Sequence, residues 1–147
     1  MSLKNSIFDE NWNISAECAC SSKDSSWTKD INELFDKESG RFIDGWGLVN
    51  IEYINPSSTE NINPTVKLWL SFGDEEIGLI FLYVIDEAMI LKEQLDEYCC
   101  HLEEVQQSVL IREEGHIVFA CEFTSGLRLY IKSEGITVDR ISMKIDD

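Results

Sequence analysis

Histidines and carboxylates are the first side chains of this sequence to consider for catalysis. The two histidines, His101 and His116, are the only imidazoles that could serve acid–base catalysis, and neither belongs to a recognisable catalytic constellation. The sequence contains no Gly-x-Ser-x-Gly elbow, no His-Glu-x-x-His zinc helix and no phosphate-binding glycine-rich loop. No acidic residue stands two places before a lysine, the spacing found in common metal-dependent nucleases. We therefore expect a protein that is not an enzyme, with no catalytic residues and no cofactor, although chance carboxylate pairs of the glycosidase type stay open.

Five cysteines could bind metal or form disulfides, but their number and spacing favour neither. The count is odd, and no export signal accompanies it, so reduced thiols are expected. Cys18 and Cys20, like Cys99 and Cys100, lack the gap of about two to four residues that lets two thiolates bind one zinc ion. We expect small, buried, apolar cysteines and no metal site.

Acidic side chains are concentrated in residues 74–114, which contain twelve acidic and two basic residues in a chain of net charge −16. Read as a helix over residues 86–107, the segment has its apolar side chains on one face and a narrow row of acids opposite. Neighbouring like charges on a helix cost about 0.2–0.5 kcal/mol per pair, so uncompensated acids favour a basic protein partner. The alternative is an acidic face that is simply solvated. The expected partner-binding residues are Asp86, Glu93, Asp96, Glu97, Glu103, Glu104, Glu113 and Glu114.

Hydrophobic patterning predicts one α+β domain over residues 1–147, with a predominantly antiparallel sheet and two helices. The predicted order is β-α-β-β-β-α-β-β-β-β. The first helix is expected to begin at Ser25 or Ser26 and to end at Gly40, and the second is the acidic helix over residues 86–107. Strands are expected at residues 12–20, 46–54, 65–72, 77–85, 108–112, 116–123, 127–132 and 136–145.

Turn residues and one phase shift refine this strand pattern. Hairpin turns are expected at residues 73–76, 114–115, 125–126 and 134–135. A change of phase in the last strand predicts a bulge at Asp139 and Arg140. In the strand at residues 65–72, the even-numbered residues form one apolar face, which leaves Trp69 on the other. We expect Trp69 either to be covered by another element or to anchor a partner.

The overall charge also limits where the protein acts and what it binds. No apolar run of signal-peptide length occurs near the amino terminus, and the longest apolar stretch, residues 77–85, is far shorter than the roughly twenty residues that cross a bilayer. A cytoplasmic location is therefore expected. With a net charge of −16 and only scattered lysines and arginines, direct binding to nucleic acid or membrane is not expected.

The acidic turns Asp74-Glu75-Glu76 and Glu113-Glu114, the acid-faced helix and the lack of a catalytic motif occur together in a small, strongly acidic chain. In this it resembles the bacterial immunity proteins that neutralise polymorphic or contact-delivered toxins. The resemblance lies in size, charge and patterning, and it assigns no individual residue. It implies that the acids complement the basic cleft of a nuclease-like toxin, accelerate association and block the toxin's active site or a neighbouring surface.

Three classes of function stay open at this point. The first is the immunity-type inhibitor, with a nucleic-acid-mimicking inhibitor of a defence nuclease as a close relative whose acids would be spaced like phosphates. The second is a structural or adaptor domain with a solvated acidic face. The third is an unrecognised enzyme or small-ligand binder, for which a deep pocket with His101 or His116 beside a carboxylate would be the sign.

Overall fold

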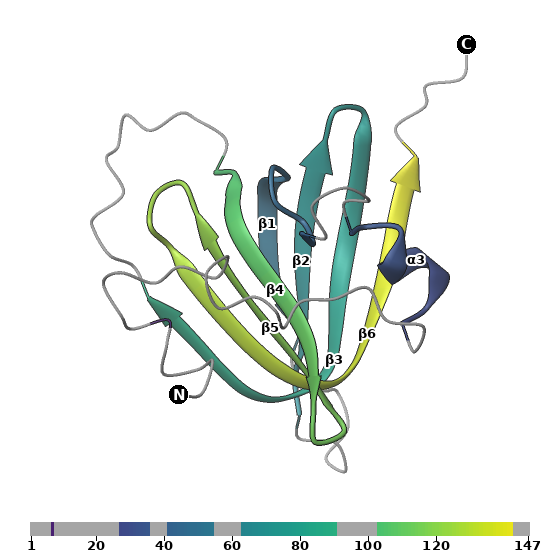
Figure 1. Ribbon diagram of the computed structural model, residues 1–147, viewed down its shortest axis with the longest axis vertical. Helices are drawn as coiled ribbons and strands as arrows, with labels where there is room; N and C mark the ends of the chain where they lie inside the picture. Colours follow the sequence, from purple (N-terminus) through teal and green to yellow (C-terminus); the bar gives the residue numbers. More distant parts are fainter. Residues whose placement is uncertain (1–6, 8–26, 36–40, 55–62, 91–102, 143–147) are drawn as a thin grey trace.

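One six-stranded antiparallel sheet dominates the protein, as seen in a computed structural model that describes residue 7 and residues 27–35, 41–54, 63–90 and 103–142. Along the sheet the strands follow the order β1-β2-β3-β6-β5-β4. The expected α+β architecture with two helices is wrong, because a single short helix, α3, accompanies the sheet in these ranges (Figure 1). The antiparallel character of the sheet is confirmed. The elements are α3 (Lys29–Asn32), β1 (Gly47–Ile54), β2 (Thr65–Phe72), β3 (Glu75–Ile90), β4 (Val105–Glu113), β5 (His116–Phe123) and β6 (Arg128–Ser142).

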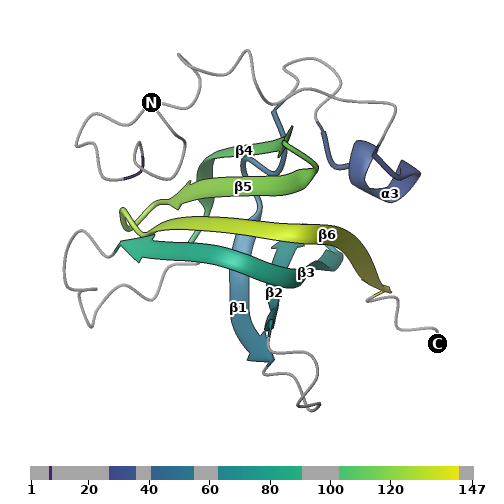
Figure 2. The ribbon, with the colours of Figure 1, turned by 90° about the horizontal axis from the view of Figure 1, so that it is seen from below.

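Two long strands, β3 and β6, form the centre of the sheet and pair along almost their whole length. Their register shifts between Val84 and Asp86, and Tyr83 has a positive φ of 55°, so an extra residue bulges from β3. A bulge bends its strand and increases the local twist. The two views of the ribbon show the result, a strongly curved sheet with β1 and β2 turned away from the β4–β5 hairpin (Figures 1 and 2).

The two edge strands, β1 and β4, meet at one end although they lie farthest apart in the strand order. Gly47 and Glu104 form an isolated antiparallel bridge there. The Gly45 amide donates to the Val105 carbonyl at 2.8 Å, and the Val105 amide donates to the Trp46 carbonyl at 2.7 Å. These hydrogen bonds join the two edges of the sheet at this end. They also satisfy backbone groups that an open edge would leave unpaired.

Most of the hydrophobic core lies on the inner side of the curve. All six strands contribute to it, together with α3 and the segment before β1. The rings of Phe81 and Phe119, from non-adjacent strands, lie 5.1 Å apart between centroids, and Phe42 packs on Phe119 at 6.2 Å. A smaller cluster on the other face packs Ile7 over β4, β5 and β6. Strand β5 is therefore covered on both faces, and its residues from Ile117 to Cys121 are all buried.

The predicted acidic helix over residues 86–107 is wrong at both of its ends. Residues 86–90 complete β3 and residues 105–107 begin β4, while residues 91–102 lie outside the described part of the chain. Asp86 pairs with Lys132, and Met89 pairs with Leu129, so the segment obtains its hydrogen bonds from β6. The apolar residues fit a helical period, but pairing with a distant strand overrides such a local pattern.

The predicted first helix is much shorter than expected. Within the described residues 27–35, only Lys29–Asn32 is helical, and Thr28 rather than a serine caps it, with its hydroxyl accepting from the Ile31 amide at 3.4 Å. Ser25, Ser26 and Gly40 lie outside the described residues, as does the predicted strand at residues 12–20. Trp27, Ile31, Leu34 and Phe35 are nevertheless buried, as their spacing predicts.

The last two predicted strands form one continuous strand, β6. The expected turn at Glu134 and Gly135 is wrong, since Gly135 pairs with Leu82 within the sheet. The expected bulge at Asp139 and Arg140 is also wrong, because both residues stay in register with β3. The irregularity lies on the opposing strand, at the β3 bulge. The other expected strands between residues 46 and 123 are confirmed with small changes of boundary, as are the turns at residues 73–74, 114–115 and 125–126.

Candidate binding site

A tight turn before β1 positions the side chains of Asp44 and Trp46. The Trp46 amide donates to the Ile43 carbonyl at 3.2 Å, which closes a four-residue turn with Asp44 and Gly45 at its centre. Gly45 has a φ of +93°, a conformation that the third position of a type II turn requires and that other residues rarely adopt. The turn lies against the start of β4 through the Gly45–Val105 hydrogen bond, so Asp44 and Trp46 lie beside Glu104 and Val105.

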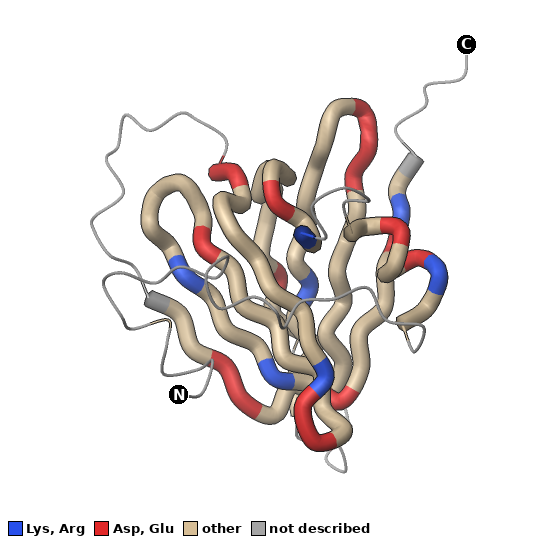
Figure 3. The backbone as a smooth tube through the Cα atoms, in the orientation of Figure 1, with Lys and Arg blue, Asp and Glu red and all other residues tan. Residues whose placement is uncertain are grey.

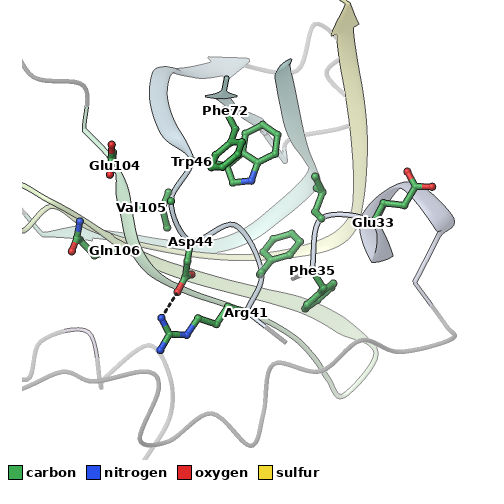
Figure 4. Close-up of a pocket in the computed structure, with 12 residues that line it drawn as sticks. Glu33, Phe35, Arg41, Asp44, Trp46, Phe72, Glu104, Val105 and Gln106 are labelled. Atoms are coloured by element: carbon green, nitrogen blue, oxygen red, sulfur yellow. Dashed lines mark ion pairs between the residues drawn. The ribbon is translucent and has the colours of Figure 1, made fainter. Parts of the chain in front are cut away.

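These residues line a pocket of about 630 Å³ at the end of the sheet where β1 and β4 meet (Figure 4). This volume lies within the range of about 300–1,000 Å³ typical of ligand pockets. We call this end of the molecule, with the pocket, α3 and the β2–β3 turn, the pocket end. The lining residues are Glu33, Leu34, Phe35, Arg41, Phe42, Asp44, Gly45, Trp46, Phe72, Glu104, Val105 and Gln106.

Aromatic rings form part of the pocket wall. Trp46 and Phe72 pack against each other with 5.4 Å between ring centroids and a tilt of 40° (Figure 4). Phe72 is 56% exposed although it belongs to the apolar face of β2, because β2 ends there. Deeper in the fold, Phe35 and Phe42 pack with their centroids 4.8 Å apart. The pocket therefore offers two tilted aromatic rings, Trp46 and Phe72, that solvent or a ligand can reach.

Asp44 is the most strongly held carboxylate of the pocket. The Ser108 hydroxyl donates to Asp44 Oδ1 at 2.6 Å and accepts from the Ile43 amide at 3.1 Å, which fixes the carboxylate relative to β4. Arg41 Nη1 lies 3.8 Å from Asp44 Oδ2. Burial raises the pKa of the Asp44 carboxyl above its ordinary value, and the Ser108 hydrogen bond and the Arg41 charge oppose that shift only in part. The side chain is 17% exposed, so it is partly desolvated but can still be reached from the pocket.

The two other carboxylates of the pocket differ in their partners. Glu33 pairs with Arg140 at 3.3 Å and with Lys29 at 3.9 Å, so its charge is largely compensated. Glu104 is exposed, and its backbone is anchored by exchange of hydrogen bonds with Thr124. No ion pair involves the Glu104 carboxylate within the described ranges. Three carboxylates and one guanidinium line the pocket, and because Arg140 and Lys29 pair with Glu33, the acidic excess that favours a cationic ligand comes from Asp44 and Glu104.

The pocket has no arrangement suited to acid–base or nucleophilic catalysis among its described residues. Ser108 is only 4% exposed, and both its hydrogen bonds are structural. His116 lies at the start of β5, at the far end of the β4–β5 hairpin from the pocket, and His101 lies outside the described residues. In the described ranges no group of three or more His, Cys, Asp or Glu residues could hold a metal ion. Cys121 is a buried thiol, as expected, while the other four cysteines are outside these ranges.

The eight acids predicted to bind a partner do not form one face. Glu93, Asp96 and Glu97 lie outside the described residues. Asp86 belongs to β3, which is separated from β4 by two strands, so it cannot share a row with Glu104. Whether any of these residues binds a partner stays a prediction.

The remaining predicted acids are divided between the two ends of β4. Glu103 and Glu104 lie at the pocket end, where the Ser125 hydroxyl donates to Glu103 Oε2 at 2.7 Å. Glu113 ends β4 and Glu114 begins the β4–β5 turn, at what we call the turn end, about 30 Å away at about 3.3 Å per strand residue. Figure 3 shows acidic positions in the loops at both ends of the sheet. The structure therefore brings together only part of the predicted set.

Trp69 lies on the outer face of β2, as predicted, and its own sheet partly covers it. Its ring packs over Gly78, where an added Cβ would lie only 2.8 Å from a ring carbon. Its indole nitrogen donates to Glu52 at 3.2 Å, and the Lys67 amino group lies 5.7 Å from the ring centroid. The neighbouring strands thus provide a hydrogen-bond acceptor and a packing surface for Trp69. It is therefore a weaker candidate than Trp46 and Phe72 for contact with a partner protein.

Sequence reasoning missed Arg41, Asp44, Trp46 and Phe72 as site residues. An Asp-Gly pair directly before a tryptophan and a strand is a local turn signal that could have pointed to the first three. Nothing in the sequence indicates that Phe72 and Glu104 reach the same pocket, because the contact depends on the meeting of β1 and β4.

No helix in the described part of the chain is long and apolar enough to cross a membrane. Comparisons of the chain with protein-family models, curated proteins and solved structures gave no match.

Proposed function

We propose that this protein is a non-enzymatic acidic binding protein that neutralises a basic, nuclease-like toxin by electrostatic docking, in the manner of bacterial immunity proteins. The observation that carries the proposal is the acidic pocket with an aromatic rim at the meeting point of β1 and β4. The predicted helical row of acids no longer contributes, because its ends belong to strands of the sheet.

Charge at the pocket end supports a basic partner. Arg140 pairs with Glu75 at 2.9 Å and with Glu33 at 3.3 Å, so one cation serves two carboxylates. Asp74 and Glu104 have no cation partner among the described residues. The whole chain has a net charge of −16, so its field adds to that of the pocket end. Such a field attracts a positively charged protein from a distance and increases the rate of encounter.

Aromatic side chains at the pocket offer an apolar contact surface in addition to the charges. Buried aromatic anchors contribute most of the binding energy in many interfaces, whereas exposed charges at the rim mainly set the rate of association. Phe72 is more than half exposed and packs on Trp46 beside the carboxylates. A basic partner would therefore meet both an attractive field and an apolar contact surface at the same place.

Capture from cells that naturally contain the protein tests this proposal. We expect immobilised protein to retain a protein of net positive charge at low salt, and the retained amount to fall steeply between about 0.05 and 0.5 M salt as the charges are screened. The captured protein, assayed alone, should be toxic or cut nucleic acid, and the acidic protein should suppress that activity. A retained partner that is neutral or acidic, or retention that is insensitive to salt, would contradict the proposal.

An adaptor domain with solvated acids is the second candidate. It is favoured by Glu113 and Glu114, which lie exposed at the turn end and form no ion pair within the described ranges. The same capture experiment distinguishes the two functions, because an adaptor of this kind would retain its partner at high salt.

A further inference from the structure

The pocket combines a carboxylate held at fixed geometry with an accessible aromatic pair. Asp44 is anchored by Ser108, which is itself held by a backbone amide, so the carboxylate keeps its position without a ligand. Trp46 and Phe72 stand at the rim of the same cavity (Figure 4). A planar cation matches both features, because a guanidinium group stacks on aromatic rings and donates to carboxylates.

An intramolecular guanidinium already lies near this carboxylate. Arg41 Nη1 is 3.8 Å from Asp44 Oδ2, beyond the roughly 2.7–2.9 Å of a well-formed charge-assisted hydrogen bond. The Arg41 side chain is 58% exposed. Asp44 is only 17% exposed, so the contact is half-buried, but at 3.8 Å it lacks a direct hydrogen bond, and a guanidinium that donates directly to Asp44 can replace Arg41 there.

We propose that the pocket receives one arginine side chain of the basic partner, whose guanidinium binds Asp44 beside the Trp46–Phe72 pair and takes the place of Arg41. This inference rests on the proposed function and specifies how the partner is recognised. Arg41 then acts as a competitor that occupies the carboxylate until the partner arrives.

The charges around the cavity favour a cation over an anion. Beyond Glu33, which pairs with Arg140 and Lys29, two carboxylates and one guanidinium line it, and the hydroxyl of Ser108 is already committed to Asp44. An anionic ligand would have to rely on Arg41 alone and would face Glu104. Lysine is a weaker match than arginine, because its compact ammonium group cannot donate in a bidentate manner or stack as a plane.

Binding of N-acetyl-L-arginine amide to the purified protein tests the inference without the partner. In a titration followed by amide and indole NMR signals, we expect saturable shifts at Gly45 and at the Trp46 indole. The dissociation constant should be about 1 mM, as ordinary ligand efficiency gives for a molecule of this size. N-acetyl-L-citrulline amide, a neutral isostere, should cause no saturable shift, and the lysine analogue should bind several-fold more weakly.

Three variants identify the groups involved. Asp44→Asn should weaken binding of the arginine probe by about tenfold or more. Arg41→Gln should strengthen it several-fold, because the competitor is gone. Phe72→Ala changes an exposed ring and should weaken binding several-fold, which keeps the test valid if Asp44→Asn does not fold. Glu114→Gln, at the turn end, is the matched control and should leave the dissociation constant unchanged.

Several results would overturn the inference. These are no saturable shift with the arginine probe, equal binding of the citrulline analogue, or weaker binding after Arg41→Gln, which would mean that Arg41 supports the bound probe and does not compete with it. If the probe fails to bind while a basic partner is still captured in a salt-dependent manner, the inference falls and the proposed function stands. If the probe binds as expected and no basic partner is captured, the proposed function falls and the guanidinium site stands.

Discussion

The pocket end and the turn end of β4 both carry adjacent glutamates, yet the surfaces around these glutamates differ. Glu103 and Glu104 lie where two edge strands meet, beside a cavity with an aromatic wall. Glu113 and Glu114 lie on a hairpin turn, and Glu113 to Gly115 are all exposed. A concentration of acids in the sequence therefore does not locate a binding site. The meeting of distant strands creates the concave surface on which a partner's side chain can be buried.

Each end of β4 also lies beside a glycine turn, and substitutions in these two turns should give the largest effects. Gly45 and Gly115 have φ values of +93° and +83°, so alanine at either position forces a left-handed conformation that costs about 1–2 kcal/mol. An added Cβ meets only an ordinary contact with Phe72 at Gly45 and nothing within 4 Å at Gly115. We expect Gly45→Ala and Gly115→Ala to lower the free energy of unfolding by similar amounts in urea denaturation.

Binding of the arginine probe then separates the two variants. Gly45→Ala should weaken binding, because the turn that positions Asp44 and Trp46 is distorted, whereas Gly115→Ala should not. Equal loss of binding in both variants would mean that general destabilisation, rather than the pocket, controls the interaction.

A smaller effect is expected from the charge of Asp44 and its dependence on pH. Because burial raises the pKa of this carboxyl, its contribution to stability is fully present below the ordinary value of 3.8 and is lost as the pH rises through the raised pKa. Asp44→Asn removes this titration. The variant should therefore gain stability relative to the parent protein between pH 3 and pH 7, by up to about 1 kcal/mol, the usual net value of such polar contacts.

Denaturant unfolding at pH 3 and pH 7 measures this difference. Glu114→Gln, a charge removed from an exposed turn, serves as the control for the general effect of lowering the net charge. The contrary result is that Asp44→Asn lowers the free energy of unfolding by the same amount at pH 7 as at pH 3. In that case Asp44 is a structural residue whose charge is well compensated, and its presence needs no functional explanation.

The strands were predictable from the sequence where the pattern is local. Strands β2 and β5 follow alternating or continuous apolar runs, and Gly73, Gly115 and Gly126 mark tight turns with positive φ. Such signals depend only on neighbouring residues. The end of β3 was not predictable in this way, because Asp86–Ile90 fits both a helix and a strand, and its pairing with β6 decides between them.

The pocket could not be predicted from neighbouring residues either, because it too depends on contacts between distant strands. Glu104 was expected to bind a partner as part of a helical row, and the structure places it beside Asp44 through the β1–β4 contact instead. Phe72 was expected on a buried face, but β2 ends there, and its ring is exposed against Trp46. Residues that meet only because the sheet curves cannot be grouped by spacing along the chain.

Docking of the basic partner at the pocket end is tested by the association rate of the captured partner with two charge-reversed variants. We predict that Glu104→Lys lowers the association rate constant several-fold, up to about tenfold at low salt, because it reverses a charge at the docking site. Glu114→Lys, an equal change of charge at the turn end, should lower it by no more than about twofold, the effect of net charge alone. Equal losses from the two variants, or a greater loss from Glu114→Lys, would contradict docking at the pocket end.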